Sequence, residues 1–447
     1  MTARTQLLLP SWIAPVEPAR TVLPDHALVM RDGQILELAP RDHALARHPD
    51  AERVELPGRL LIPGLVNLHA HLPMALLRGA GDDLPLHRWL NERIWPIEGR
   101  LMSDAFAHDG ALLAGWELLR GGTTCVNDMY FHADAVARAL GTLGMRAVLG
   151  IVVLGFPTSW AATPDEYLAK GFALRDRLSD EPLFGFALAP HAPYTVPDET
   201  FVRIATLSAE LGLPIHCHVH ETAQEVADSV ATHGVRPLAR LDALGVVGPD
   251  LIAVHAVHLS DAEIDLLAAR GASVAHCPHS NLKLGSGIAR TTDLRACGVN
   301  VGIGTDGSAS NNRLDMIAEA RTAALLAKGS RGDATAWNAH ATLEAATLAG
   351  ARALGLEARI GSLVPGKAAD IAAIDLGDID FRPMHDPVSQ LVFMCGREQV
   401  SDVWVAGRAV VRNRQPVDSS AAEALAEVTA RVAVWQNRSS DVLTSRI

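Results

Sequence analysis

The stretch Pro63-Gly64-Leu65-Val66-Asn67-Leu68-His69-Ala70-His71 places two histidines two positions apart, at the end of an apolar run that begins at Leu60. In an extended strand, alternate side chains point to the same face. Both imidazoles therefore face one space, as the first two ligands of a metal site would. A pair of surface or core histidines would give the same local pattern. Matching ligands later in the chain decide between these two interpretations.

The chain of 447 residues is long enough for a catalytic domain and a smaller second domain. Hydrophobic residues make up 49% and charged residues 20%, as in globular proteins with a large core. The net charge of −12 disfavours non-specific binding to nucleic acids or anionic membranes. The five cysteines are widely spaced without a CxxC pair, and no signal or membrane-spanning segment is evident. We expect a cytoplasmic protein with reduced cysteines.

Eight short apolar runs alternate with amphipathic helical patterns through the middle of the chain. Strands followed by helices, repeated eight times, predict an α/β fold with a parallel (β/α)₈ barrel, the TIM barrel. An open doubly wound sheet would need a glycine-rich phosphate turn after its first strand, and the sequence has none. The eight runs are Leu60–His71, Thr124–Met129, Arg146–Leu154, Leu183–Ala189, Pro214–His220, Leu251–Leu259, Ser273–Cys277 and Asn300–Thr305.

The two ends of the chain have a different pattern, with short alternating runs separated by turns. We expect residues 1–59 and 361–447 to form one small composite β-sandwich with a C-terminal helix over Ala421–Gln436. Residues 60–360 would then form the barrel.

Polar side chains gather where the predicted barrel strands end, which is the end at which such barrels keep their active sites. Three imidazoles and a carboxylate from different strand ends would make an open divalent-metal site. The residues at these ends are His69, His71, His191, His216, His218, His220, Glu221, His255, His258, His276, His279 and Asp306.

Four motifs together resemble those of the amidohydrolase superfamily. They are PGLVNLHAH (Pro63–His71), HVHE (His218–Glu221), AVHAVHLS (Ala253–Ser260) and GTDGSASNN (Gly304–Asn312), and the turn GSLVPGKAAD (Gly361–Asp370) extends the resemblance toward the C-terminus. The sequence is most similar to the branch of 5′-methylthioadenosine/S-adenosylhomocysteine deaminases, which lies near the guanine and cytosine deaminases and the triazine hydrolases.

This resemblance implies a set of site residues. The implied metal ligands are His69, His71, His218 and Asp306, with Glu221 as general acid/base. Asp306 would also accept a proton, and His255 would hydrogen-bond the attacking hydroxide. The predicted fourth strand ends in Pro190-His191 without a nearby lysine that could bridge two metals. The resemblance therefore implies one divalent metal, with Zn²⁺ preferred and Fe²⁺ or Mn²⁺ as alternatives.

The resemblance also implies a substrate, because Glu98 matches a glutamate that binds ribose hydroxyls and His191 a histidine that contacts the purine. Some members of the branch carry arginines after the third strand, where they could bind a homocysteine carboxylate. This chain has none there before Arg175, which favours an apolar 5′-substituent. The expected reaction is hydrolytic deamination of 5′-methylthioadenosine, with S-adenosylhomocysteine or adenosine as further substrates, giving the inosine analogue and ammonia.

Two alternatives remain open from the sequence: another amidohydrolase, of the guanine/cytosine deaminase or triazine hydrolase type, and a non-catalytic scaffold homologue. Trp89 and Trp95 could stack on a purine or pack in the core. Supporting or packing roles are also open for five histidines: His216, His220, His258, His276 and His279. The expected partner is a small nucleoside rather than a nucleic acid or membrane. A homo-oligomer such as a dimer is the assembly that the family suggests.

Overall fold

The computed structural model describes residues 5–444. The chain divides into two compact units, and each is described by itself. One unit comprises Met1–Asn67, Trp116–Cys125 and Asp315–Ala422, and the other Leu68–Gly115, Val126–Leu314 and Glu423–Ile447. The domain boundaries expected from the sequence stay a prediction.

Eight strands form the predicted barrel, in the order in which they occur along the chain. Neighbouring strands run parallel, as in the pairing of Val152 with Ala189. Beyond the last strand, the backbone N–H of Asp306 donates to the carbonyl of His69 in the first strand at 3.0 Å, which links the two ends of the sheet. The (β/α)₈ prediction is therefore confirmed. The strands are β6 (Leu65–Ala70), β7 (Thr123–Asp128), β8 (Arg146–Val153), β9 (Phe184–Pro190), β10 (Ile215–Val219), β11 (Leu251–His255), β12 (Ser273–His276) and β13 (Asn300–Ile303).

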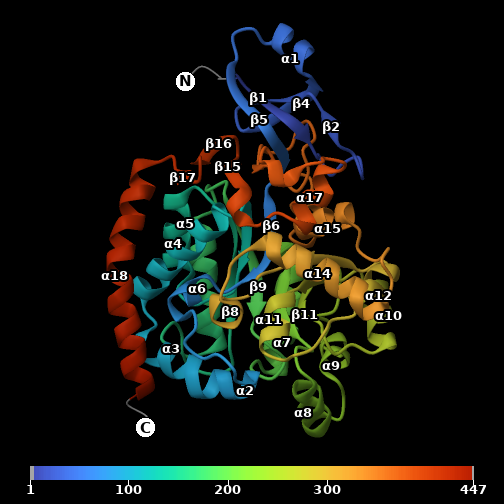
Figure 1. The fold of residues 1–447 in the computed structure, drawn as a ribbon. Helices are drawn as coiled ribbons and strands as arrows, with labels where there is room; N and C mark the ends of the chain where they lie inside the picture. The colour runs from blue at the N-terminus through green and yellow to red at the C-terminus, as the bar shows by residue number, and fades with distance from the viewer. Residues whose placement is uncertain (1–4, 445–447) are drawn as a thin grey trace. The chain divides into compact units, whose positions relative to one another are not determined.

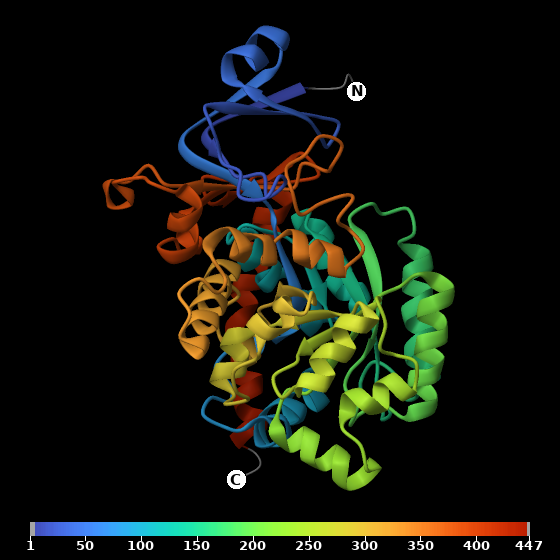
Figure 2. The ribbon, with the colours of Figure 1, turned by 90° about the vertical axis from the view of Figure 1, so that its right-hand side faces the viewer.

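Helices follow these strands along the chain, as the ribbon shows (Figures 1 and 2). Their starts follow ordinary capping chemistry. Ser260 and Glu263, for example, form a capping box at the start of α10. The helices are α4 (Asp104–Leu119), α5 (Ala133–Leu143), α6 (Pro164–Arg177), α7 (Asp198–Leu211), α8 (Ala223–His233), α9 (Pro237–Ala243), α10 (Asp261–Arg270), α11 (Pro278–Lys283), α12 (Thr291–Ala296), α13 (Ser308–Asn311), α14 (Met316–Arg331), α15 (Ala339–Ala345) and α16 (Leu348–Ala353).

The first predicted run, Leu60–His71, consists of two strands that belong to different sheets. Its beginning is the end of β5 (Glu52–Pro63), which pairs antiparallel with β14 (Ile371–Asp375). The barrel strand β6 starts only at Leu65, because the Pro63-Gly64 corner interrupts the first ladder. The expectation of a single strand over this run was therefore wrong.

Strands from the two ends of the chain pair with each other, as expected. Among the described residues they form one continuous mixed sheet of nine strands, in the order β17-β16-β15-β14-β5-β1-β3-β4 with β2 beside β1. Its core includes Leu8, Leu61 and Trp404, which come from both ends of the sequence. The remaining elements of this unit are β1 (Thr5–Ile13), β2 (Leu23–Pro24), β3 (His26–Arg31), β4 (Gln34–Pro40), α1 (Arg41–Arg47), η3 (Ile379–Phe381), α17 (Pro387–Phe393), η4 (Arg397–Gln399), β15 (Val400–Val405), β16 (Arg408–Arg412) and β17 (Gln415–Pro416).

The longest connection between barrel strands follows β6 and is irregular. It consists of the 3₁₀ helix η1 (Leu72–Leu77), α2 (Leu86–Trp89), the π-helix η2 (Leu90–Ile94) and α3 (Trp95–Leu101) before α4 begins. Its apolar residues pack in one core cluster with Trp435 and Val442 of the C-terminal helix α18 (Ser419–Thr444). None of the helices described between residues 5 and 444 combines the length and hydropathy needed to span a bilayer.

Candidate metal centre and substrate pocket

The barrel brings the predicted metal ligands together at the C-terminal ends of three strands. His69 lies in β6 with His71 just after it, His218 lies in β10, and Asp306 follows β13. The Nε2 atoms of His69 and His71 lie 3.2 and 3.3 Å from Oδ1 of Asp306. The Nε2 atom of His218 lies 3.3 Å from that of His69. Ligand atoms this close form two overlapping groups that could hold a metal ion, His69-His71-Asp306 and His69-His218-His255.

Hydrogen bonds to the opposite ring nitrogens set the orientation of these imidazoles. Nδ1 of His71 donates to the carbonyl of Met129 at 2.5 Å, and Nδ1 of His218 donates to the carbonyl of His191 at 2.7 Å. Because a carbonyl only accepts, each Nδ1 carries the hydrogen, and a neutral ring then has its Nε2 lone pair free. Nδ1 of His69 lies 2.8 Å from Nε2 of His216. Such partners are those that orient metal-binding histidines, and the residues present fit a divalent metal.

The pKa shifts of the four proposed ligands favour the protonation states that bind a metal. Burial lowers the pKa of His69 to about 4, despite the opposing hydrogen bond with Asp306. Burial likewise lowers the pKa of His71 and holds that of His218 well below its usual value. For Asp306, burial alone would raise the pKa, but the hydrogen bond with His69 and the nearby imidazole charges hold it well below its usual range. Neutral imidazoles and an ionised carboxylate are the forms that ligate a metal.

Asp306 is fixed by three donors in addition to its histidine neighbours. The hydroxyls of Ser280 and Ser310 donate to Oδ2 at 2.6 and 2.8 Å, and the backbone N–H of Gly307 donates to Oδ1 at 2.7 Å. The backbone of Asp306 is left-handed, with φ of 61°. This conformation is uncommon for a residue other than glycine and is typical of functional sites.

Glu221 lies beside His255 in the same buried space. Oε2 of Glu221 is 3.8 Å from Nε2 of His255, and Ser286 donates to Oε1 at 3.4 Å. Burial raises the pKa of Glu221. Nδ1 of His255 lies 2.8 Å from Oδ1 of Asn281. Burial lowers the pKa of His255, but the charges of Glu221 and Asp306 outweigh it and raise that pKa overall.

The turn that carries Glu221 is held by a second carboxylate. Oε1 and Oε2 of Glu225 accept the backbone N–H groups of His220 and Glu221 at 2.9 and 2.7 Å. His220 has φ of 56°, so the chain turns sharply just after β10. Glu225 therefore stabilises the turn that directs the Glu221 side chain toward His255.

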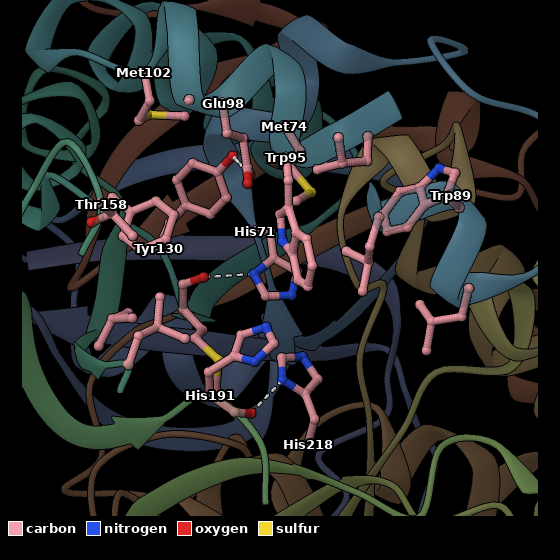
Figure 3. Close-up of a pocket in the computed structure, with 18 of the residues that line it drawn as sticks. His71, Met74, Trp89, Trp95, Glu98, Met102, Tyr130, Thr158, His191 and His218 are labelled. Atoms are coloured by element: carbon pink, nitrogen blue, oxygen red, sulfur yellow. Dashed lines mark hydrogen bonds between the residues drawn. The ribbon is translucent and has the colours of Figure 1, made fainter. Parts of the chain in front are cut away.

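A cavity of about 280 Å³ lies above the histidine and aspartate cluster, near the lower end of the range of small-molecule sites. His71, His191, His218, Glu221, His255 and Asp306 line it together with Glu98. Figure 3 shows His191 and His218 toward one end of the drawn pocket and Glu98 with Tyr130 toward the other. The predicted site residues therefore meet in or beside one cavity.

The rest of the cavity wall is mostly apolar. Trp89 and Trp95, which the sequence left between stacking and core roles, both line the cavity, and Trp89 is also buried in the neighbouring core cluster. Among the described lining residues there is no lysine or arginine. The wall includes Met74, Leu86, Leu90, Ile94, Met102, Phe131, Val152, Leu154, Phe156 and Pro157.

Several supporting residues were not identified from the sequence. Tyr130, Asn281, Ser280 and Glu225 act on site residues through tertiary contacts, and only Glu225 has a local signal. It is the third residue after the helix cap Thr222, a spacing typical of a capping box. The five histidines left open are placed as follows: His216 beside His69, His220 and His258 in hydrogen bonds that hold the surrounding loops, His276 buried, and His279 half-buried in α11.

Comparison with known proteins places the chain in a family. The model of the amidohydrolase family matches residues 60–410. A curated 5-methylthioadenosine/S-adenosylhomocysteine deaminase from Teredinibacter turnerae is 46% identical over 428 residues, which cover 96% of each chain.

Solved structures agree with this match. An adenosine deaminase from Xanthomonas campestris with bound zinc is 50% identical, has a TM-score of 0.95 and is covered over 98% of each chain. A zinc-complexed atrazine chlorohydrolase from Arthrobacter aurescens is 25% identical, with a TM-score of 0.87 over 96% of this chain and all of that one. The resemblance inferred from the motifs is confirmed, and the chain belongs to the amidohydrolase family.

Proposed function

We propose that the protein is a metal-dependent hydrolase that deaminates the adenine ring of a nucleoside, with 5′-methylthioadenosine as its best substrate. One observation carries the proposal: a single cavity contains the histidine and aspartate cluster, Glu221 and, toward its other end, the carboxylate of Glu98. The names of the deaminase relatives support the same reaction.

His69, His71, His218 and Asp306 are the proposed ligands of one divalent metal. Zn²⁺ suits three imidazoles and a carboxylate, and the zinc in two related structures supports it, with Fe²⁺ and Mn²⁺ as the alternatives. A metal held there supplies activation of water for attack at neutral pH. None of the residues that line the cavity is a lysine that could bridge a second metal.

The proposed proton transfers use groups of the chain. Asp306 accepts a proton from the attacking water, while Glu221 protonates N1 of the adenine ring. Glu221, now ionised, takes the proton from the new C6 hydroxyl and transfers it to the departing amino group. Asp306 then returns its proton to Glu221, so that water and the substrate give the 6-oxo product and ammonia. The raised pKa of Glu221 suits a group that both donates and accepts protons. His255, whose ring is held by Asn281, hydrogen-bonds the attacking oxygen.

Substrate recognition follows from the other end of the cavity. Glu98 accepts hydrogen bonds from the 2′- and 3′-hydroxyls of ribose, and His191 contacts the purine. The 5′-substituent then meets an apolar wall without a lining cation. A methylthio group gains from such burial, whereas the charged groups of homocysteine would lose hydration without a partner.

The proposal is tested by measuring ammonia release from 5′-methylthioadenosine, S-adenosylhomocysteine, adenosine, adenine, guanine and a chlorotriazine with the metal-loaded protein. We expect the highest kcat/KM with 5′-methylthioadenosine. A preference for a free base or for the triazine would identify another amidohydrolase, and no turnover of any compound by metal-loaded protein would identify a scaffold.

The dimeric state and the cytoplasmic location stay predictions. Sedimentation of the purified protein tests the dimeric state.

A further inference from the structure

The hydroxyl of Tyr130 donates a hydrogen bond to Oε1 of Glu98, and Figure 3 shows this pair at the end of the pocket away from His218. Tyr130 follows β7, whereas Glu98 lies in α3, so the bond joins the barrel to the irregular connection after β6. Both residues line the cavity. The contact is therefore tertiary, and it involves the group proposed to bind ribose.

Tyr130 is the only hydrogen-bond partner of the Glu98 carboxylate among residues 5–444. The ring of Tyr130 is buried in the apolar cluster that includes Met102 and Ile97, which fixes its position. Burial and the charge of Glu98 hold the pKa of Tyr130 well above its usual value, so the phenol remains a donor at neutral pH. One oxygen of Glu98 is thus held by a rigid donor, and Oε2 has no hydrogen-bond partner within the described part of the chain.

A carboxylate in this position needs such a donor. Burial raises the pKa of Glu98 to about 7, and the Tyr130 hydrogen bond opposes that rise. A protonated carboxyl would present a donor to one ribose hydroxyl, whereas the ionised form accepts from both. A donor that favours the ionised form also favours binding of a vicinal diol.

We propose that Tyr130 is a positioning residue for ribose recognition: it holds Oε1 of Glu98 and directs Oε2 toward the 2′- and 3′-hydroxyls of the substrate. This inference rests on the proposed nucleoside substrate. It assigns to Tyr130 a specificity role that acts through Glu98 and is separate from the chemistry at the metal cluster.

The test compares Tyr130→Phe with wild type on two substrates that differ only in the diol, 5′-methylthioadenosine and 5′-methylthio-2′,3′-dideoxyadenosine. We expect kcat/KM for the ribose substrate to fall about tenfold, mainly through KM, as the loss of one hydrogen bond to a charged group predicts. The dideoxy analogue should change less than twofold. Equal losses on both substrates would overturn the proposal.

A matched control is available because the chain has three tyrosines. Tyr167 is buried, and its hydroxyl donates to Thr158 at 2.7 Å without contacting Glu98. Tyr167→Phe should affect both substrates equally. Metal content and melting temperature of both variants are measured alongside the kinetics.

Two further measurements separate positioning from a structural effect. In a Glu98→Gln background, Tyr130→Phe should add little to the loss on the ribose substrate, whereas independent effects would multiply. In Tyr130→Phe alone, the pH at which KM for the ribose substrate falls should move upward, because the donor that lowers the pKa of Glu98 is gone. A full additive loss, or an unmoved pH profile, would contradict the proposal. Wild-type protein that turns over neither nucleoside would instead refute the proposed function.

Discussion

The two ends of the cavity are built differently. At the metal end, each proposed ligand has a second partner: His71 and His218 donate to carbonyls, His69 meets His216, and two serines donate to Asp306. At the ribose end, the Glu98 carboxylate lies in a connection made of 3₁₀, α and π turns and has Tyr130 as its single hydrogen-bond partner among the described residues. The metal end is held by barrel strands, whereas the ribose end depends on the packing of an irregular segment. We infer that the metal end determines the chemistry and that the ribose end determines the choice of substrate.

The largest expected effect is at the metal end. Glu221→Gln removes the proposed acid/base but keeps the shape of the side chain, so kcat should fall by about 10²–10⁴-fold. Metal content should be unchanged, because Glu221 is not a proposed ligand. Steady-state kinetics and elemental analysis measure the two quantities. The exposed Glu210→Gln serves as the control, and a Glu221→Gln variant with near wild-type kcat would remove Glu221 from the mechanism.

The next effect concerns the support of Asp306. Replacing both Ser280 and Ser310 by alanine removes the two hydroxyl donors to Oδ2. We expect metal affinity to fall by about 10–100-fold, as for other partners of metal ligands. Competition with a chromogenic chelator measures the affinity. The exposed Ser440→Ala is the control, and unchanged affinity in the double variant would show that the serines do not fix the carboxylate.

A third prediction concerns the core beneath the ribose end. Asp109 accepts two hydrogen bonds from Arg431 and one from the indole of Trp435, and these bonds hold α18 against the cluster that contains Tyr130. Asp109→Ala should lower the free energy of unfolding by about 2 kcal/mol and raise KM several-fold. Metal affinity should not change. Denaturant unfolding and kinetics check these outcomes, with the exposed Asp176→Ala as control.

The contribution of Asp109 to the free energy of unfolding should depend on pH in a definite direction. Although burial opposes it, the hydrogen bond from Arg431 holds the pKa of Asp109 well below its usual value. Its stabilising contribution is therefore complete above about pH 4, the ordinary pKa in an unfolded chain, and is lost as the pH falls further. The difference between wild type and Asp109→Ala should shrink on acidification below that point. A constant difference down to pH 2 would mean that the Asp109 charge is not responsible.

The smallest expected effect is a change of preference at the apolar wall. Ser159 lies on the loop after β8 and lines the cavity, and none of the described lining residues is a lysine or an arginine. Ser159→Arg should raise kcat/KM for S-adenosylhomocysteine several-fold relative to 5′-methylthioadenosine, because it supplies a partner for a carboxylate. Ser159→Gln, which is long but uncharged, is the control. An equal response to both variants would indicate that charge is not what excludes homocysteine.

The sequence predicted the proposed metal ligands at the ends of barrel strands, and there is a physical reason why such a pattern can be recognised. A barrel strand buried on both faces reads as a continuous apolar run, and the residues that follow it lie at the same rim. Amphipathic patterns cover Ala133–Leu143 and Asp198–Leu211, and these are the bounds of α5 and α7. The roles of the individual site residues stay proposals, although the structure brings them together.

The supporting contacts at both ends were less predictable, because they join distant parts of the chain and belong to no motif. Tyr130 meets Glu98 across 32 residues, and Asn281 meets His255 across 26. Such pairs leave no periodic signal. The C-terminal helix also extends to Thr444, beyond the predicted Gln436, because Val442 packs in the core cluster of the ribose end. The apolar run Leu60–His71 was likewise predicted as a single strand, although the Pro63-Gly64 corner divides it between β5 and β6.

The central claim is hydrolytic replacement of an amino group on the adenine ring. It is tested most directly by incubating metal-loaded protein with 5′-methylthioadenosine in ¹⁸O-labelled water and analysing the products by mass spectrometry. We expect the inosine analogue to carry one ¹⁸O atom, with one ammonia released per molecule formed. Free adenine as the product, or intact 5′-methylthioadenosine after prolonged incubation, would contradict the account.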